Sequence, residues 1–110
     1  MRSLLSVLVV AGCGRDIDVA CTSSTLTYET FGQPFMLDWC TGCHSDALPP
    51  GQRQSAPVYL NFDTLDQVRA WSTQIQIRAG PTEPTMPPAG GPSVAEREML
   101  AEWLHCGAPQ

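Results

Sequence analysis

Apolar residues recur at spacings of three and four in three segments of this chain, which predicts three short amphipathic helices. The first is expected to begin at Pro34, because proline is favoured in the first turn of a helix, and to run into residues 40–44. Phe35 and Trp39 lie four residues apart on one face of this helix and are expected in the core.

The second helix is predicted over residues 64–78. Asp63 or Thr64 supplies a capping side chain, and Gly80 with Pro81 ends the helix. Its apolar residues follow one another at spacings of three, three and four: Leu65, Val68, Trp71 and Ile75.

The last helix follows Ser93, which forms a capping box with Glu96, and it ends before Gly107. Its apolar face consists of Leu100, Trp103 and Leu104. We expect Trp103 to pack on the first helix. Residues 45–62 and 81–92 separate the helices and are predicted to be loops, because proline and glycine are frequent there. The pattern as a whole predicts an all-α fold.

Length and charge limit what such a chain can bind. Its 110 residues fit one small domain, and six Arg with no Lys against eleven Asp and Glu give a formal charge of −5. This balance argues against nucleic acid or anionic lipid as the main partner, because both are negatively charged. No run of twenty apolar residues is present, so a membrane-spanning helix is not expected.

The N-terminus has the layout of an export signal. A short start that contains Arg2 precedes the apolar residues 4–10, and small residues then lead to Cys13. The Val-Ala-Gly-Cys sequence that ends there resembles the lipobox of bacterial lipoproteins, whose cysteine is acylated. We therefore expect a signal peptide over residues 1–12, a lipid anchor on Cys13 and a polar tether over residues 13–29. The alternative is a buried N-terminal strand that ends in a structural cysteine.

The strongest chemical motif is Cys40-Thr41-Gly42-Cys43-His44, the C-x-x-C-H pattern of covalent c-type haem attachment. Residues three and four apart share one face of a helical turn. Two thiols can therefore reach the vinyl groups of a porphyrin while the imidazole reaches the iron. The motif occurs once, so one haem per chain is expected.

Three other interpretations of this motif fit less well. A thioredoxin-like redox pair needs a βαβ context, which the pattern lacks. A zinc site would need Cys21, Cys106 or His105 to converge on the motif from distant segments. A structural disulfide between Cys40 and Cys43 is the third alternative.

The second axial position of the iron decides the function, because a filled position suits an electron carrier and an open one suits gas binding or catalysis. Met86 lies 42 residues beyond His44 in a segment whose five prolines restrict the backbone enough to hold a thioether in place. We predict Met86 as this ligand; the alternative is a solvent-facing linker. The other candidates are Met36, Met99 and His105. The two methionines fall on predicted helices, Met99 in a packing stripe, and the histidine lies beyond the last helical turn.

These motifs make residues 30–109 resemble a small mono-haem class I cytochrome c. The resemblance rests on the C-x-x-C-H motif, on the Thr-Met-Pro-Pro sequence around Met86 and, less specifically, on residues 100–109. It implies a cytochrome c domain over residues 30–110, with three or four short helices around one covalently bound haem c. It also implies that His44 and Met86 lie on opposite sides of the iron.

The same resemblance suggests roles for three further residues. The carbonyl of Pro57, with two earlier prolines as rivals, would accept the ring N–H of His44 and orient the imidazole. Arg53 is interpreted either as a contact of a haem propionate or as an ordinary solvated arginine. Trp71 is interpreted either as a haem contact or as a core residue.

Cys21 and Cys106 remain once the other cysteines are assigned to lipid and haem. Export places the chain in an oxidising compartment, so we expect these two to form a disulfide that encloses about 85 residues. The alternatives are two separate thiols or an intermolecular bridge from Cys21.

Together these features predict an electron carrier rather than an enzyme. We expect it in the periplasm, lipid-anchored to a bacterial membrane, where its haem iron passes single electrons between redox protein partners. One alternative is a haem-based gas sensor or peroxidase-like enzyme with an open or displaceable sixth position. The other is a non-haem lipoprotein that is stabilised by disulfides.

Overall fold

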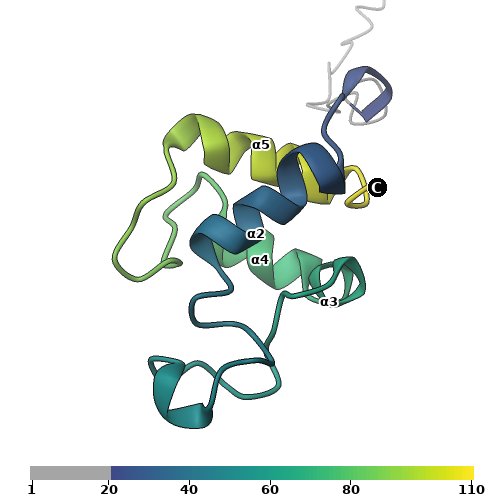
Figure 1. Cartoon of the computed structure of the whole chain (residues 1–110). Coiled ribbons are helices and arrows are strands. Elements are labelled where there is room, and N and C mark those ends of the chain that lie inside the picture. The colour runs from purple at the N-terminus through teal and green to yellow at the C-terminus, as the bar shows by residue number, and fades with distance from the viewer. Residues whose placement is uncertain (1–20) are drawn as a thin grey trace, which may run out of the picture.

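The computed structural model describes residues 21–110, so the predicted signal peptide and the predicted lipid anchor at Cys13 lie outside the described residues. The elements are η1 (Tyr28–Gly32), α2 (Gln33–Trp39), η2 (Pro50–Gln52), α3 (Leu65–Ala70), α4 (Ser72–Ala79) and α5 (Val94–His105). In Figure 1, α2, α4 and α5 lie together, and the segment between α2 and α3 extends away from them as a long loop. The all-α prediction is confirmed for this part of the chain. None of its helices has the length and apolar character needed to span a bilayer.

The first helix begins earlier than predicted, because the π-helical turn η1 continues directly into α2. Thr27 caps it, with its hydroxyl accepting the N–H of Thr30 at 3.1 Å. Leu26 and Tyr28 are partly buried against the core. Residues 21–29 therefore belong to the folded part, and the predicted boundary at residue 30 lies inside η1. The threonines and serines of this segment, which indicated a tether, include a helix cap.

Helix α5 crosses the first helix at Gly32. Trp103 is fully buried, and its indole lies so close to Gly32 that an added Cβ would collide with the ring. The indole also stacks on Tyr28 with ring centroids 6.2 Å apart and meets Phe31 edge-on. The prediction that Trp103 packs on the first helix is confirmed.

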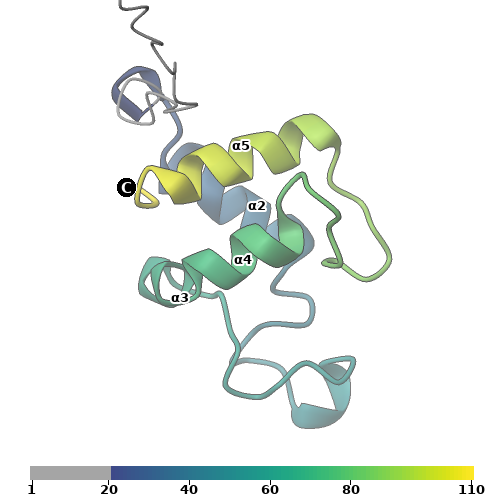
Figure 2. The ribbon, with the colours of Figure 1, turned by 180° about the vertical axis from the view of Figure 1, so that it is seen from behind.

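The helix predicted over residues 64–78 is divided into α3 and α4. Trp71 separates them, with φ −108° and ψ 13°. Its N–H is shared between the carbonyls of Gln67 and Val68, so the backbone tightens there, and Figure 2 shows α3 turning away from α4. The prediction of one helix is wrong at this point. The change of direction lets Trp71 stack on Tyr59 in the long loop, with centroids 6.2 Å apart.

The core lies between the first helix, the α3–α4 pair and α5. Its buried apolar residues are Phe35, Met36, Phe62, Leu65, Val68, Ile75, Ala79, Leu100, Trp103, Leu104 and Ala108. Full burial of one large apolar side chain stabilises a fold by about 1.5–3 kcal/mol. Met99 is exposed, which corrects its predicted place in the packing stripe of α5. It precedes the buried Leu100 by one position, about 100° around the helix.

The C-terminus is tied to the rest of the fold by a disulfide and by hydrogen bonds, one of which runs from the N–H of Tyr28 to the carbonyl of Pro109 at 2.8 Å. Cys21 and Cys106 are joined by a disulfide, with Cα atoms 5.3 Å apart. Arg69 of α3 donates two hydrogen bonds to the carbonyl of Ala108, at 3.2 and 3.0 Å. The segment that precedes η1 and the end of the chain are therefore held against the helices.

Removal of this disulfide is expected to destabilise the protein. Cys106→Ser should lower the free energy of unfolding by at most about 4–5 kcal/mol, because the unfolded chain regains the freedom that the cross-link removes. Urea unfolding followed by tryptophan fluorescence measures the change. The double variant Cys21→Ser/Cys106→Ser is the control and should equal the single one, since each lacks the same bond. An unchanged unfolding midpoint in Cys106→Ser would contradict this prediction.

Candidate functional site

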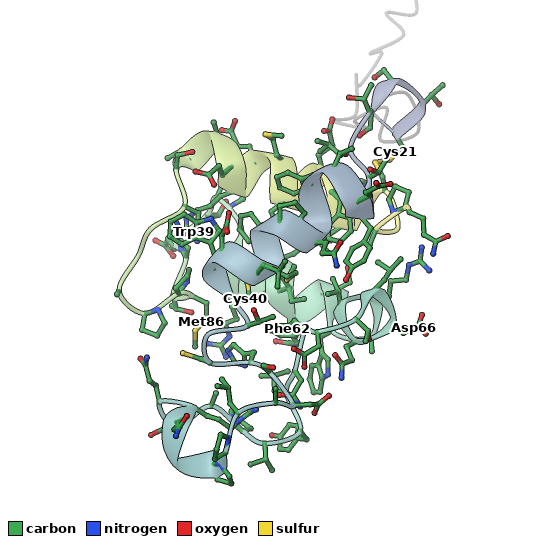
Figure 3. All side chains as sticks on the ribbon, viewed as in Figure 1. Cys21, Trp39, Cys40, Phe62, Asp66 and Met86 are labelled. Atoms are coloured by element: carbon green, nitrogen blue, oxygen red, sulfur yellow. A yellow bond between two sulfur atoms is a disulfide. The ribbon has the colours of Figure 1, made fainter. Side chains whose placement is uncertain are left out.

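One cavity of about 400 Å³ contains four of the residues that the sequence singled out: Cys40, Cys43, His44 and Met86. Its size lies within the range of small-molecule and cofactor sites. Most of the remaining lining is apolar and includes Trp39, Leu60, Phe62, Trp71, Ile75 and Ala79. Figure 3 shows Cys40 at the end of α2 near Met86 and Phe62, whereas Cys21 and Asp66 lie away from this group.

The attachment motif lies on a single turn that follows α2. The N–H groups of Cys43 and His44 both donate to the carbonyl of Cys40, at 3.1 and 2.9 Å. This turn keeps the three side chains on the side that lines the cavity. The sequence required such a turn for haem attachment, and α2 supplies it by ending one residue before the motif.

The thiols of Cys40 and Cys43 are free. Burial, assisted by the neighbouring Cys43, raises the pKa of Cys40 to about 12. Cys40 therefore stays protonated at neutral pH, whereas a thioredoxin-like pair uses a thiolate of lowered pKa. Cys106, one of the distant cysteines that a zinc site would need, is bonded to Cys21. The raised pKa thus disfavours the thioredoxin-like interpretation, and the disulfide engages two of the three distant residues that a zinc site could recruit.

His44 is oriented by the backbone of the following loop. Its Nδ1 lies 3.0 Å from the carbonyl oxygen of Leu60, and that oxygen can only accept, so Nδ1 carries the proton. The lone pair on Nε2 is then the one that can bind a metal. This corrects the expectation that the carbonyl of Pro57 would hold His44. The Phe62 N–H donates to the His44 carbonyl at 2.9 Å and sets the register that places Leu60 there instead.

Arg53 is only 1% exposed, so its interpretation as a solvated arginine is wrong. Its guanidinium donates to four backbone carbonyls, those of Ser45, Ala56, Pro57 and Leu60. The Pro57 carbonyl accepts from Arg53 at 2.7 Å and is thus engaged with the guanidinium. These bonds connect the start of the loop, at Ser45, with residues 56–60 near its end.

Met86 is held through both of its backbone groups. Its N–H donates to the carbonyl of Arg78 at 2.8 Å, at the end of α4. Its carbonyl accepts from Arg97 of α5, also at 2.8 Å, and Arg97 makes a second bond to the carbonyl of Ala79. Met86 itself is 37% exposed. The segment around Met86 is thus bound to α4 and α5, which differs from a solvent-facing linker.

The role of Arg97 was not predicted from the sequence, although its position on the helix indicates burial. Arg97 precedes Leu100 and Leu104 by three and seven residues, so it lies on the apolar face of α5. A buried arginine on such a face needs acceptors from another segment. The pattern could indicate the burial but not which carbonyls would accept.

Trp39 completes the wall beside the Met86 segment. Its indole N–H donates to the Glu96 carboxylate at 3.2 Å. The backbone N–H of Ser93 donates to the same carboxylate and holds the pKa of Glu96 below its usual value. The Trp39 ring also lies against Gly91, where an added Cβ would collide with it. Trp39 is half-buried between the cavity and the cap of α5, not in the core cluster itself.

The other predicted candidates lie in different places. Met36 is in the core, and Met99 and His105 are exposed on α5. Among the methionines of residues 21–110, Met86 alone lines the cavity. Trp71 also lines the cavity and is half-buried. A group bound in the cavity would therefore be within reach of its ring.

Comparison of the chain with protein-family models, with curated protein sequences and with solved structures finds no match. The apolar lining, the paired thiols and the two potential axial ligands fit a covalently attached haem.

The contact between Trp39 and Gly91 gives a test of how the wall is built. Gly91 has φ +135°, and a Cβ there meets the indole, so Gly91→Ala should lower the free energy of unfolding by about 1–3 kcal/mol. Gly90→Ala is the matched control, because Gly90 also has a positive φ, +77°, but its Cβ meets nothing within 4 Å. Thermal unfolding measures both variants. Equal melting temperatures for the two would show that the close contact has no energetic weight.

Proposed function

We propose that this protein is a mono-haem electron carrier with a class I cytochrome c-like fold. The observation that carries the proposal is that Cys40, Cys43, His44 and Met86 line one apolar cavity, although 42 residues separate the last two. Haem iron supplies reversible one-electron chemistry: ferric iron takes one electron from a donor, and ferrous iron passes it to an acceptor.

The two thiols would hold the haem covalently. Each would add across a vinyl double bond, with the sulfur bound to one vinyl carbon and the hydrogen to the other. This addition would involve no net oxidation or reduction. It requires free thiols rather than a disulfide. Cys40 and Cys43 are not bonded to each other, and the raised pKa of Cys40 keeps that thiol protonated, which supports this use of the motif.

The axial ligands would come from His44 and Met86. His44 offers Nε2, because Leu60 holds the proton on Nδ1. Met86 offers its thioether from the other segment of the wall. A methionine ligand raises the reduction potential relative to a second histidine, since thioether sulfur stabilises the ferrous state.

The support for a carrier over a gas sensor or peroxidase-like enzyme is the fixation of Met86. Either alternative needs a sixth position that is open or easily vacated. The Met86 backbone is bound at its N–H by Arg78 and at its carbonyl by Arg97, which opposes its departure. The free thiols likewise oppose the non-haem alternative, in which Cys40 and Cys43 would be bonded to each other.

The setting of the carrier is part of the same proposal. The signal-like residues 1–12 and Cys13 would place the chain in the periplasm, anchored to a membrane by lipid. Its partners would be redox proteins rather than nucleic acid. Because the chain has no Lys, docking to such a partner would depend on apolar contacts and acidic groups.

The visible spectrum of the periplasmically matured protein tests the proposal. We expect covalent haem, a low-spin six-coordinate spectrum with a methionine-to-iron charge-transfer band, and no change when carbon monoxide is added to the reduced form. Met86→Ala should lose the band and bind carbon monoxide, whereas the exposed Met99→Ala should behave as the wild type. Absence of haem after competent maturation would refute the proposal. A wild-type spectrum that responds to carbon monoxide would favour the gas-binding alternative.

Arg97 should be needed to keep Met86 on the iron. Arg97→Met leaves two carbonyls without their donor, which is expected to cost about 1–3 kcal/mol of stability for each one that stays buried. The variant should also bind carbon monoxide in its reduced form, because the Met86 segment keeps its bonds to α4 but loses its bond to α5. Arg69→Met is the control, since Arg69 likewise donates twice to the backbone but at the C-terminus. An Arg97→Met protein that resists carbon monoxide would contradict this role.

A further inference from the structure

The carbonyl oxygen of Leu60 accepts two hydrogen bonds. One comes from Nδ1 of His44 at 3.0 Å, and the other from Nη2 of Arg53 at 3.2 Å. A carbonyl oxygen has two lone pairs, so it can satisfy both donors at once. His44 is thus separated from a guanidinium by a single backbone oxygen.

Arg53 brings a full positive charge to this position. It is 1% exposed, and its hydrogen bonds all go to backbone carbonyls, so no carboxylate in the described part of the chain neutralises it. The Asp46 carboxylate of the same loop accepts hydrogen bonds from Asn61 and Gln67. Arginine stays protonated at all relevant pH values, so the charge is permanent.

We propose that Arg53 is a positioning residue for His44 that acts through the Leu60 carbonyl and raises the reduction potential of the iron. This inference rests on the proposed haem function. A bound haem would supply the one-electron chemistry, with a redox partner as the source of the electron, and Arg53 would neither gain nor lose a proton.

Two effects of Arg53 have the same sign. The guanidinium draws electron density from the Leu60 oxygen and weakens its pull on the Nδ1 proton, so the imidazole is less basic and stabilises ferric iron less. The buried positive charge also opposes the extra positive charge of the ferric state. Both effects favour ferrous iron.

A purely structural role for Arg53 makes a different prediction. Its bonds to Ser45, Ala56 and Pro57 fold the loop, and their loss alone would change stability without a fixed direction for the potential. The reduction potential therefore separates the two roles. A variant that keeps the charge should recover most of the potential even where it restores few of the hydrogen bonds.

The experiment compares redox titrations of the matured holoprotein. Arg53→Met should shift the ferric-to-ferrous ratio at a fixed solution potential at least tenfold toward ferric, which is about 59 mV for a one-electron couple. Arg53→Lys keeps the charge and should shift the ratio less than threefold. Arg69→Met removes an arginine that donates to the C-terminal backbone instead and should shift it less than twofold. In the ferrous proteins, the His44 Nδ1 proton resonance should move downfield in Arg53→Met, because its bond to Leu60 strengthens.

The outcomes distinguish this inference from the proposal beneath it. Covalent haem with an unchanged potential in Arg53→Met would overturn the role of Arg53 and leave the proposed function standing. A shift in Arg53→Lys as large as in Arg53→Met would overturn it too, since the charge would then have no effect. A wild-type chain without haem would refute the proposed function and this inference together. In case Arg53→Met does not mature, Arg53→Gln keeps N–H donors without the charge; a shift of at least threefold toward ferric supports the role, and a smaller one overturns it.

Discussion

Hydrogen bonds from two buried guanidinium groups to backbone carbonyls hold the walls of the cavity together. Two loops flank the cavity, residues 45–62 and 81–92, and they contain only one short helical turn. Most of their carbonyls therefore do not accept the hydrogen bonds of a helix or a sheet. Arg53 donates to four carbonyls within residues 45–62. Arg97 links residues 81–92 to the end of α4. A planar fork with five donors suits this task, because one side chain can satisfy several acceptors that lie in different directions.

This solution has a cost that also shapes the site. A buried cation without a carboxylate loses most of its hydration, and hydrogen bonds to carbonyl dipoles offset only part of that loss. The protein bears this cost beside His44 and beside Met86, the two residues proposed to bind the haem iron. The apolar core of α2, α4 and α5 supplies the rigid frame that makes both placements possible. The structural and electrostatic roles of these arginines are therefore difficult to separate by stability measurements alone.

The sequence was informative where the controlling interactions are local. Helical periodicity, a capping side chain at Asp63 or Thr64 and the capping box at Ser93 predicted the starts of α3 and α5, and the spacing of the C-x-x-C-H motif predicted its turn. The break at Trp71 and the carbonyl that holds His44 could not be predicted, because both depend on how the long loop returns to the helices. Arg53 was misjudged for the same reason: its acceptors are backbone groups, which carry no signature in the side-chain sequence.

If haem occupies the cavity as proposed, the construction has a consequence for electron transfer. His44 and Met86 belong to separate segments, each fastened to the helical frame by backbone hydrogen bonds that do not depend on the oxidation state of the iron. Both ligands could then stay in place when the iron changes charge, so little of the protein would need to rearrange with each electron. A sensor or a peroxidase-like enzyme would require the opposite arrangement, with one ligand on a segment that is free to leave. The anchoring of Met86 by Arg97 is thus the feature on which the choice between these functions turns.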